Sequence, residues 1–244
     1  MASTTSVAPT AETTESPIRE AIPELRAGDH LARAEFERRY LAMPHLKKAE
    51  LVEGVVYMPS PVRYPEHGRP HLNLAGWLAT YIAATAGVDG GDNSTVRLDL
   101  DNEPQPDACL RILPECGGQA TVSDDGYLEG APELVAEVAA SSASYDLHAK
   151  KKAYRRNGVP EYLVWRVLDQ TIDWFVLQDG NYEPRPADAD GRLRSRVFPG
   201  LWLDPAALAR GDLKTVLEVL RQGLTSPEHA DFVARLARTR AASS

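Results

Sequence analysis

The stretch ELVAEVAASSASYDLHAKKKAYRRNGVPEY, residues 133–162, decides how this chain folds. Its opening run, LVAEVA, is apolar except for one acid, Glu137, and is typical of a short buried strand. The small-residue turn AASSAS follows, and then a helix that carries the basic run KKKAYRR at 150–156. A buried acid followed by a basic helix is suited to holding a metal ion beside a phosphate.

Composition narrows the classes of protein that fit. With 244 residues, 43% hydrophobic and 25% charged, the chain can bury one sizeable core. The net charge of -8 argues against a protein that coats nucleic acid through a broad cationic surface, so a polyanion would have to meet a local patch. The sharpest such patch is the run 150–156.

Compartment and membrane association follow from what the sequence lacks. No run approaches the roughly 18 apolar residues needed to cross a bilayer, and the N-terminus has no basic segment followed by an apolar one. Cys109 and Cys116 form neither a CxxC pair nor a disulfide framework. We therefore expect a cytoplasmic protein with no membrane partner.

Three parts of the chain are distinguished by their patterns. Residues 1–20 are rich in Ser, Thr, Ala and Glu and predict a disordered leader. Residues 21–205 alternate apolar strands with amphipathic helices and predict one α/β domain. Residues 206–244 contain only helical patterns and predict a C-terminal helical extension.

Two acids flank the turn in ELVEGVVYM, residues 50–58. The segment is β-branched and apolar on both sides of Gly54, which predicts a hairpin or a bulged strand. Glu50 and Glu53 are three positions apart, and a strand sends such residues to opposite faces. Only one of the two can therefore join a common site.

Two histidines lie at the front of the next helix, whose first turn is marked by Pro70. His67 and His71 are four positions apart, a spacing that can also place two imidazoles on one metal. No third ligand of matching type lies nearby in the sequence, which disfavours structural zinc. We interpret His67 as a phosphate or substrate contact.

Asp107 directly precedes a second apolar run, in NEPQPDACLRIL at 102–113. An acid in this place is usually a turn residue. Its spacing from Glu137 suggests another role, because the two occupy corresponding places on two strands that can be neighbours. Like charges held a few ångströms apart are stable only with a cation between them.

The strings ELVEGVVYMPSP, PQPDACL and ELVAEVAASSASYDLHAKKKAYRRNGVPEYLVW together resemble the restriction endonuclease domain of the Uma family, a branch of the PD-(D/E)XK nuclease superfamily. The resemblance covers roughly residues 30 to 205. The ordered set of motifs is much more specific than any one of them. The resemblance implies a restriction-endonuclease-like α/β core, in which a mixed β-sheet flanked by α-helices carries one metal-binding edge.

The same resemblance implies a site. Asp107 matches the Asp of the PD element and Glu137 the acid of the (D/E)XK element, and with the carbonyl after Glu137 they would hold Mg²⁺ or Mn²⁺. Ala139 stands where the superfamily motif has lysine. The Uma branch carries this lysine on the following helix, where Lys150 matches it. Lys151 or Lys152 would serve if the helical phase were shifted by one, and Glu50 matches the front acid, with Glu53 as its competitor.

The leading hypothesis is thus an Mg²⁺-dependent endonuclease that acts on DNA. Its expected nucleic-acid contacts are His67, Lys151, Lys152 and Arg155. The alternative is a catalytically inactive nuclease-fold protein that binds nucleic acid or a protein partner. A third reading makes the acids and lysines a structural ion-pair network, in which Asp146 and Lys150 form an ordinary i,i+4 pair. Cutting both DNA strands normally needs two sites, which a homodimer would supply, but no residue of the sequence decides whether one forms.

Overall fold

A six-stranded mixed sheet forms the centre of the computed structural model, which describes residues 22–58, 61–140 and 142–243. The predicted disordered leader, residues 1–20, lies outside the described residues. Only β8 and β9 run parallel, and the other neighbours are antiparallel. The strand order is β11 (Asn181–Pro184), β10 (Thr171–Gln178), β9 (Glu161–Arg166), β8 (Leu134–Ala139), β5 (Ala108–Ile112) and β3 (Val88–Asp92).

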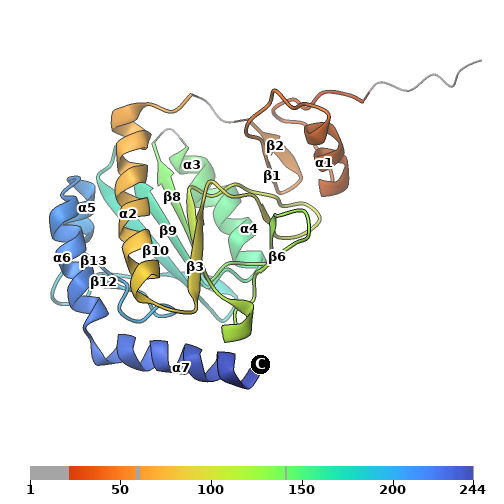
Figure 1. Ribbon diagram of the computed structural model, residues 1–244. Coiled ribbons are helices and arrows are strands. Elements are labelled where there is room, and N and C mark those ends of the chain that lie inside the picture. The colour runs from red at the N-terminus through yellow and green to blue at the C-terminus, as the bar shows by residue number, and fades with distance from the viewer. Residues whose placement is uncertain (1–21, 59–60, 141, 244) are drawn as a thin grey trace, which may run out of the picture.

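Helices cover both faces of this sheet (Figure 1). One face packs against the long helix α2 (Arg69–Ala84), which is entered through the π-helical turn η1 (Tyr64–Gly68). The other face packs against the continuous segment α3 (Ala143–Tyr145), η3 (Asp146–Lys150) and α4 (Lys151–Arg156). The predicted mixed β-sheet flanked by α-helices is confirmed.

Side-chain alternation along β8 decides which face each residue serves. Leu134, Ala136 and Val138 belong to the core under α2. Val135 and Ala139 belong to the core under α4, together with Tyr154 and Tyr162. Glu137 lies between Val135 and Ala139 in this alternation, so its carboxylate faces the basic helix.

The C-terminal helices pack into the same core as α2. They are α5 (Pro205–Ala209), α6 (Leu213–Leu224) and α7 (Pro227–Ser243). Leu208, Leu220, Phe232 and Leu236 are buried in one apolar cluster with Trp77 of α2. The first two helices begin at aspartates whose carboxylates accept backbone N–H groups, which is the usual way an Asp caps a helix.

The N-terminal segment forms a small unit of its own, beside the end of the sheet (Figure 1). It contains α1 (Arg33–Leu41) and the hairpin of β1 (Glu50–Val52) and β2 (Val55–Tyr57). Glu53 and Gly54 make the turn with φ of 53° and 73°, as a tight hairpin requires. Leu51 exchanges two backbone hydrogen bonds with Glu103, which fastens the hairpin to the segment before β5.

The remaining elements are short. A three-stranded sheet joins β4 (Val96–Arg97), β7 (Leu128–Glu129) and β6 (Thr121–Val122). A ribbon pairs β12 (Leu193–Arg194) with β13 (Trp202–Leu203), and a 3-10 turn, η2, spans Pro114–Cys116. Among the described residues, no helix has the length and apolar character needed to pass through a membrane.

Candidate metal and nuclease site

Asp107 and Glu137 lie side by side because of the register between β5 and β8. Ala108 pairs with Ala136, so the next position on each strand brings Asp107 opposite Glu137. The Asp107 N–H donates to Glu137 Oε2 at 3.4 Å, and the Val138 N–H donates to Asp107 Oδ2 at 2.7 Å. Only 6% of Asp107 and 3% of Glu137 is exposed, so both carboxylates are held in a low-dielectric interior.

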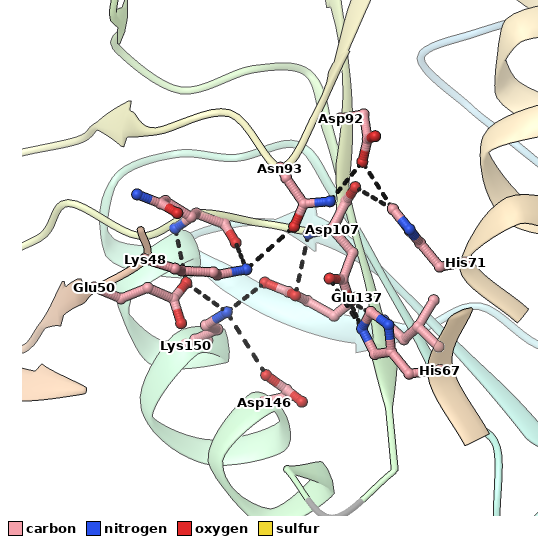
Figure 2. A network of polar contacts seen from close by, with 12 residues as sticks. Lys48, Glu50, His67, His71, Asp92, Asn93, Asp107, Glu137, Asp146 and Lys150 are labelled. Atoms are coloured by element: carbon pink, nitrogen blue, oxygen red, sulfur yellow. Dashed lines mark hydrogen bonds and ion pairs between the residues drawn. The ribbon is translucent and has the colours of Figure 1, made fainter. Parts of the chain in front are cut away.

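Lys150 reaches this pair from the basic helix. Its Nζ lies 2.9 Å from Glu137 Oε1 and 2.9 Å from Glu50 Oε1 (Figure 2). The helix is π-wound over Asp146–Lys150, a local distortion that often occurs at functional sites. Asp146 lies one turn before the lysine, with 3.9 Å between Asp146 Oδ1 and Lys150 Nζ. Of the basic residues at 150–156, Lys150 is the one that contacts Glu50 and Glu137.

Tyr154 extends the same helix face. Its hydroxyl donates to Glu137 Oε1 at 3.0 Å, and the residue is fully buried. Lys150 and Tyr154 both bind Oε1 of Glu137, whereas among the described residues Oε2 receives only the long hydrogen bond from Asp107. The two oxygens of Glu137 therefore have different environments.

The hairpin sends Glu50 toward the cluster and Glu53 away from it. Glu50 is buried, and its Oε1 accepts the Gln105 N–H at 2.7 Å in addition to Lys150. Glu53 instead pairs with Lys152 at 2.6 Å and Arg156 at 2.9 Å on the outside of α4. Of the two candidate front acids, Glu50 is the one that meets Asp107, Glu137 and Lys150.

Acidic groups outnumber basic groups in this cluster. Four buried carboxylates surround one ammonium and one imidazole; they belong to Glu50, Asp107, Glu137 and Asp146. Burial raises the pKa of Glu137 to about 8, and the neighbouring acids add to this against the opposing effect of Lys150. Burial alone would lower the pKa of Lys150, but Glu137, Glu50 and Asp146 outweigh it and raise that pKa well above its usual value. Lys150 therefore stays charged.

The ionised form of Asp107 is stabilised more by a histidine than by Lys150. Burial opposes its ionisation, but the hydrogen bond and charge of His67, the Val138 N–H and Lys150 together lower its pKa. His67 Nε2 lies 3.2 Å from Asp107 Oδ1 and 3.3 Å from Oδ2. His71 Nε2 lies 2.9 Å from the Asp107 carbonyl oxygen and 2.9 Å from Asp92 Oδ1. His67 of η1 and His71 of α2 thus both contact Asp107.

The other basic candidates lie on the outer side of the helix. Lys151 Nζ sits 3.4 Å above the centre of the Phe175 ring, and Arg155 donates to the Gly180 carbonyl at 2.7 Å. With Lys152 they line a shallow hollow of about 330 Å³. The structure therefore separates these residues, which were expected to contact nucleic acid, from the buried cluster around Lys150.

Lys48 is a nearby cation that the sequence reasoning missed. Its Nζ lies 3.2 Å from Asn93 Oδ1 and 3.2 Å from the Gln105 carbonyl, at the rim of the cluster (Figure 2). It lies two residues before Glu50, ahead of β1, and its closeness to Glu50 in the sequence was the available signal. Asp92 was missed because nothing in the sequence pairs it with His71.

The donor set fits a hard divalent cation. Asp107 and Glu137 offer carboxylate oxygens, which Mg²⁺ and Mn²⁺ prefer, and a cation would offset the excess of buried acids. Within residues 22–58, 61–140 and 142–243, no three His, Cys, Asp or Glu side chains are already gathered closely enough to hold an ion. In this arrangement two protein carboxylates are in place for an ion, and the rest of its shell would come from backbone oxygen, water or a side chain that moves toward it.

This sheet with its flanking helices defines a protein of the restriction-endonuclease-like class. The fold is similar to that of a crystal structure described as a "putative nuclease belonging to DUF820" from Anabaena variabilis, with a TM-score of 0.52 and 14% sequence identity. The match covers 70% of this chain and 97% of that one. The family model Uma2, described as "Putative restriction endonuclease", matches residues 33–206, so the chain belongs to the Uma2 family. No match to a curated protein was found.

Proposed function

We propose that this protein is a divalent-metal-dependent endonuclease that hydrolyses phosphodiester bonds of DNA. The observation that carries the proposal is the convergence of Asp107, Glu137 and Lys150, which come from three different elements, in one buried cluster with excess acid. Membership of the Uma2 family supports a nuclease. A structural ion-pair network is less well supported, since in the described part of the chain no hydrogen bond or ion pair joins Asp107 to a lysine.

Asp107 and Glu137 would be the protein ligands of Mg²⁺ or Mn²⁺. Such an ion, when bound, stabilises charge that develops on phosphoryl oxygens and makes water a better nucleophile. The chain's own contribution is to fix the two carboxylates in register. The Val138 N–H orients Asp107, and Lys150 and Tyr154 orient Glu137.

Lys150 would act through the positive charge of its ammonium rather than as a general base. Three acids raise the pKa of its ammonium, so it holds its proton throughout the neutral range. A positioned ammonium can stabilise the anionic transition state of phosphoryl transfer from a neighbouring element. Glu50 would keep Lys150 aimed at Glu137, because Glu50 is itself held by the Gln105 N–H.

Plasmid cleavage in Mg²⁺ or Mn²⁺ tests this function. We expect the wild-type chain to cut and both Asp107→Ala and Glu137→Ala to be inactive. Glu218→Ala removes an exposed acid of α6 that pairs with Lys214 at 3.8 Å, and it should cut like the wild type. Full cleavage by both site variants would rule the proposal out.

A second candidate is a nuclease-fold protein that binds nucleic acid or a partner without cutting. It is favoured by Ala139, which stands at the lysine position of the motif, and by the ammonium of Lys150, which is already engaged with Glu50 and Glu137. Calorimetric titration with Mn²⁺ separates the candidates. The binding-only function predicts no ion uptake that depends on Asp107 and Glu137.

A further inference from the structure

We propose that His67 supplies an imidazole nitrogen to the ion held by Asp107 and Glu137, so that the centre selects Co²⁺, Ni²⁺ or Mn²⁺ over Mg²⁺. This inference rests on the proposed metal-dependent function and deepens it. It assigns a nitrogen donor to a shell that would otherwise contain only oxygen.

The spacing of His67 and Asp107 is that of two ligands on one ion. His67 Nε2 lies almost equally far from the two Asp107 oxygens, at 3.2 and 3.3 Å. Two donors that each lie about 2.1 Å from an octahedral ion, at right angles to one another, are themselves about 3.0 Å apart. An ion can therefore enter between the imidazole and the carboxylate with a small movement of the side chains.

The oxygen of Glu137 that lies nearer Asp107, Oε2, is also the one available for an ion. Lys150 and Tyr154 occupy Glu137 Oε1, which excludes a second cation there. Oε2 points toward the Asp107 backbone, whose N–H donates to it over a long distance of 3.4 Å. Figure 2 shows His67 on the side of Asp107 away from Lys150.

Access and positioning support the same role. The His67 side chain is 21% exposed, compared with 9% for Asp107, so an ion has a route from solvent past the imidazole. The turn η1 ends at the following residue and feeds α2, which holds the imidazole against the sheet edge. His71 is fixed by two oxygens at 2.9 Å and would position Asp107 without binding the ion.

The nitrogen donor predicts a metal preference. Imidazole suits Co²⁺, Ni²⁺ and related ions, whereas Mg²⁺ favours carboxylate and water oxygens and binds nitrogen poorly. An all-oxygen shell would discriminate little among these ions beyond the general rise from Mn²⁺ to Ni²⁺. Removing the imidazole nitrogen should therefore weaken the binding of Co²⁺ far more than the binding of Mg²⁺.

Pulsed electron paramagnetic resonance of the full-length protein loaded with Mn²⁺ alone tests the inference directly. We expect a ¹⁴N coupling from a bound imidazole in the wild type, replaced by a ¹⁵N coupling when histidine is ¹⁵N-labelled. The coupling should persist in His71→Gln, a matched change of the second histidine on the same helix, and vanish in His67→Gln. In calorimetric titrations, His67→Gln should lower Co²⁺ affinity at least about tenfold and change Mg²⁺ affinity much less.

The outcomes distinguish this inference from the function on which it rests. If Mn²⁺ binds the wild type and is lost in Asp107→Asn, but no histidine coupling is seen, His67 is not a ligand and the nuclease proposal stands. A coupling that disappears in His71→Gln and survives in His67→Gln also overturns the assignment. If the wild type takes up no Mn²⁺, the inference and the metal-dependent function fail together. The labelled wild type gives its answer even if His67→Gln does not fold.

Discussion

Lys150 is one ammonium among three acids, and its position brings a lysine to the cluster although residue 139 is alanine. Ala139 lies on the same face of β8 as Glu137, under the basic helix. Lys150 comes down onto that face from η3 and reaches Glu137 Oε1 at 2.9 Å. The charge that the superfamily motif places on the strand is supplied here by the helix.

Removing this charge should cost both stability and activity. Lys150→Met leaves Glu50, Glu137 and Asp146 buried without their shared partner, and we expect a loss of about 3 kcal/mol or more in the free energy of unfolding. Urea denaturation measures it. Lys152→Met is the control. The Lys152 side chain is 61% exposed, so its ion pair with Glu53 should contribute under about 1 kcal/mol. Equal losses in the two variants would contradict the assignment.

The two front acids can be separated by activity. Glu50→Ala releases Lys150 from one of its two closest partners, so we expect the cleavage rate to fall about tenfold or more. Glu53→Ala disturbs only ion pairs on the outer side of α4 and should keep most of the rate. Rates on plasmid DNA under saturating metal decide between them. The opposite ranking would mean that Glu53 is the accessory acid.

At the scale of elements, the register of β5 against β8 brings the acids together, and the hairpin brings the third acid to them. The strand around Glu137 could be predicted from its apolar run, and the hairpin around Gly54 from its β-branched residues. The π-helical turn could not be predicted, because 146, 150 and 154 share a face in an ordinary helix as well. The docking of the hairpin through Leu51 and Glu103 depends on contacts far apart in the chain.

The conformation of the hairpin turn can be tested by substitution of its glycine. Gly54 has φ of 73°, so Gly54→Ala forces a side chain into the left-handed region, and we expect about 1 to 2 kcal/mol of destabilisation. Gly76→Ala, inside α2, is the matched control. An added Cβ there meets only Leu213 at 4.0 Å, so the change should be neutral or slightly stabilising. Chemical denaturation of both variants checks this; an unaffected Gly54→Ala would show that the turn is not strained.

At the scale of the whole molecule, buried acid is found in a second place as well. Glu103, which fastens the hairpin, is only 2% exposed and lies beside Glu37 and Arg97. Burial, together with the hydrogen bond and charge of Glu37, raises the pKa of Glu103 to about 8 against the opposing effect of Arg97. This pair could not be predicted from sequence patterns, because its members come from α1 and from a loop.

This pair predicts how stability depends on pH. A carboxyl whose pKa rises from 4.5 to about 8 on folding contributes stability that is full below pH 4.5 and is lost as the pH rises through 8. Without metal, the free energy of unfolding should fall by about 2 kcal/mol from pH 6 to pH 8 through Glu103. Glu137 adds a fall of the same sign, so Glu103→Gln should make the slope shallower without abolishing it. Urea denaturation with a chelator at three pH values measures it, and an unchanged slope would contradict the assignment.

The C-terminal helices show a further limit of sequence reasoning. Their apolar stripes predicted packing, but not the surface that they cover. Phe232 and Leu236 of α7 lie in the main core with Trp77, which is brought there by α2. Which face of the sheet receives a helix depends on chain topology, and local periodicity does not encode it.

The most direct test of the account is a crystal structure of the protein soaked in Mn²⁺, with the ion located by anomalous scattering. We predict one strong peak between Asp107 and Glu137, about 2.2 Å from a carboxylate oxygen of each, with Lys150 still bound to the other oxygen of Glu137. A protein that cleaves DNA with Mn²⁺ but shows no ion at these two carboxylates would contradict the account.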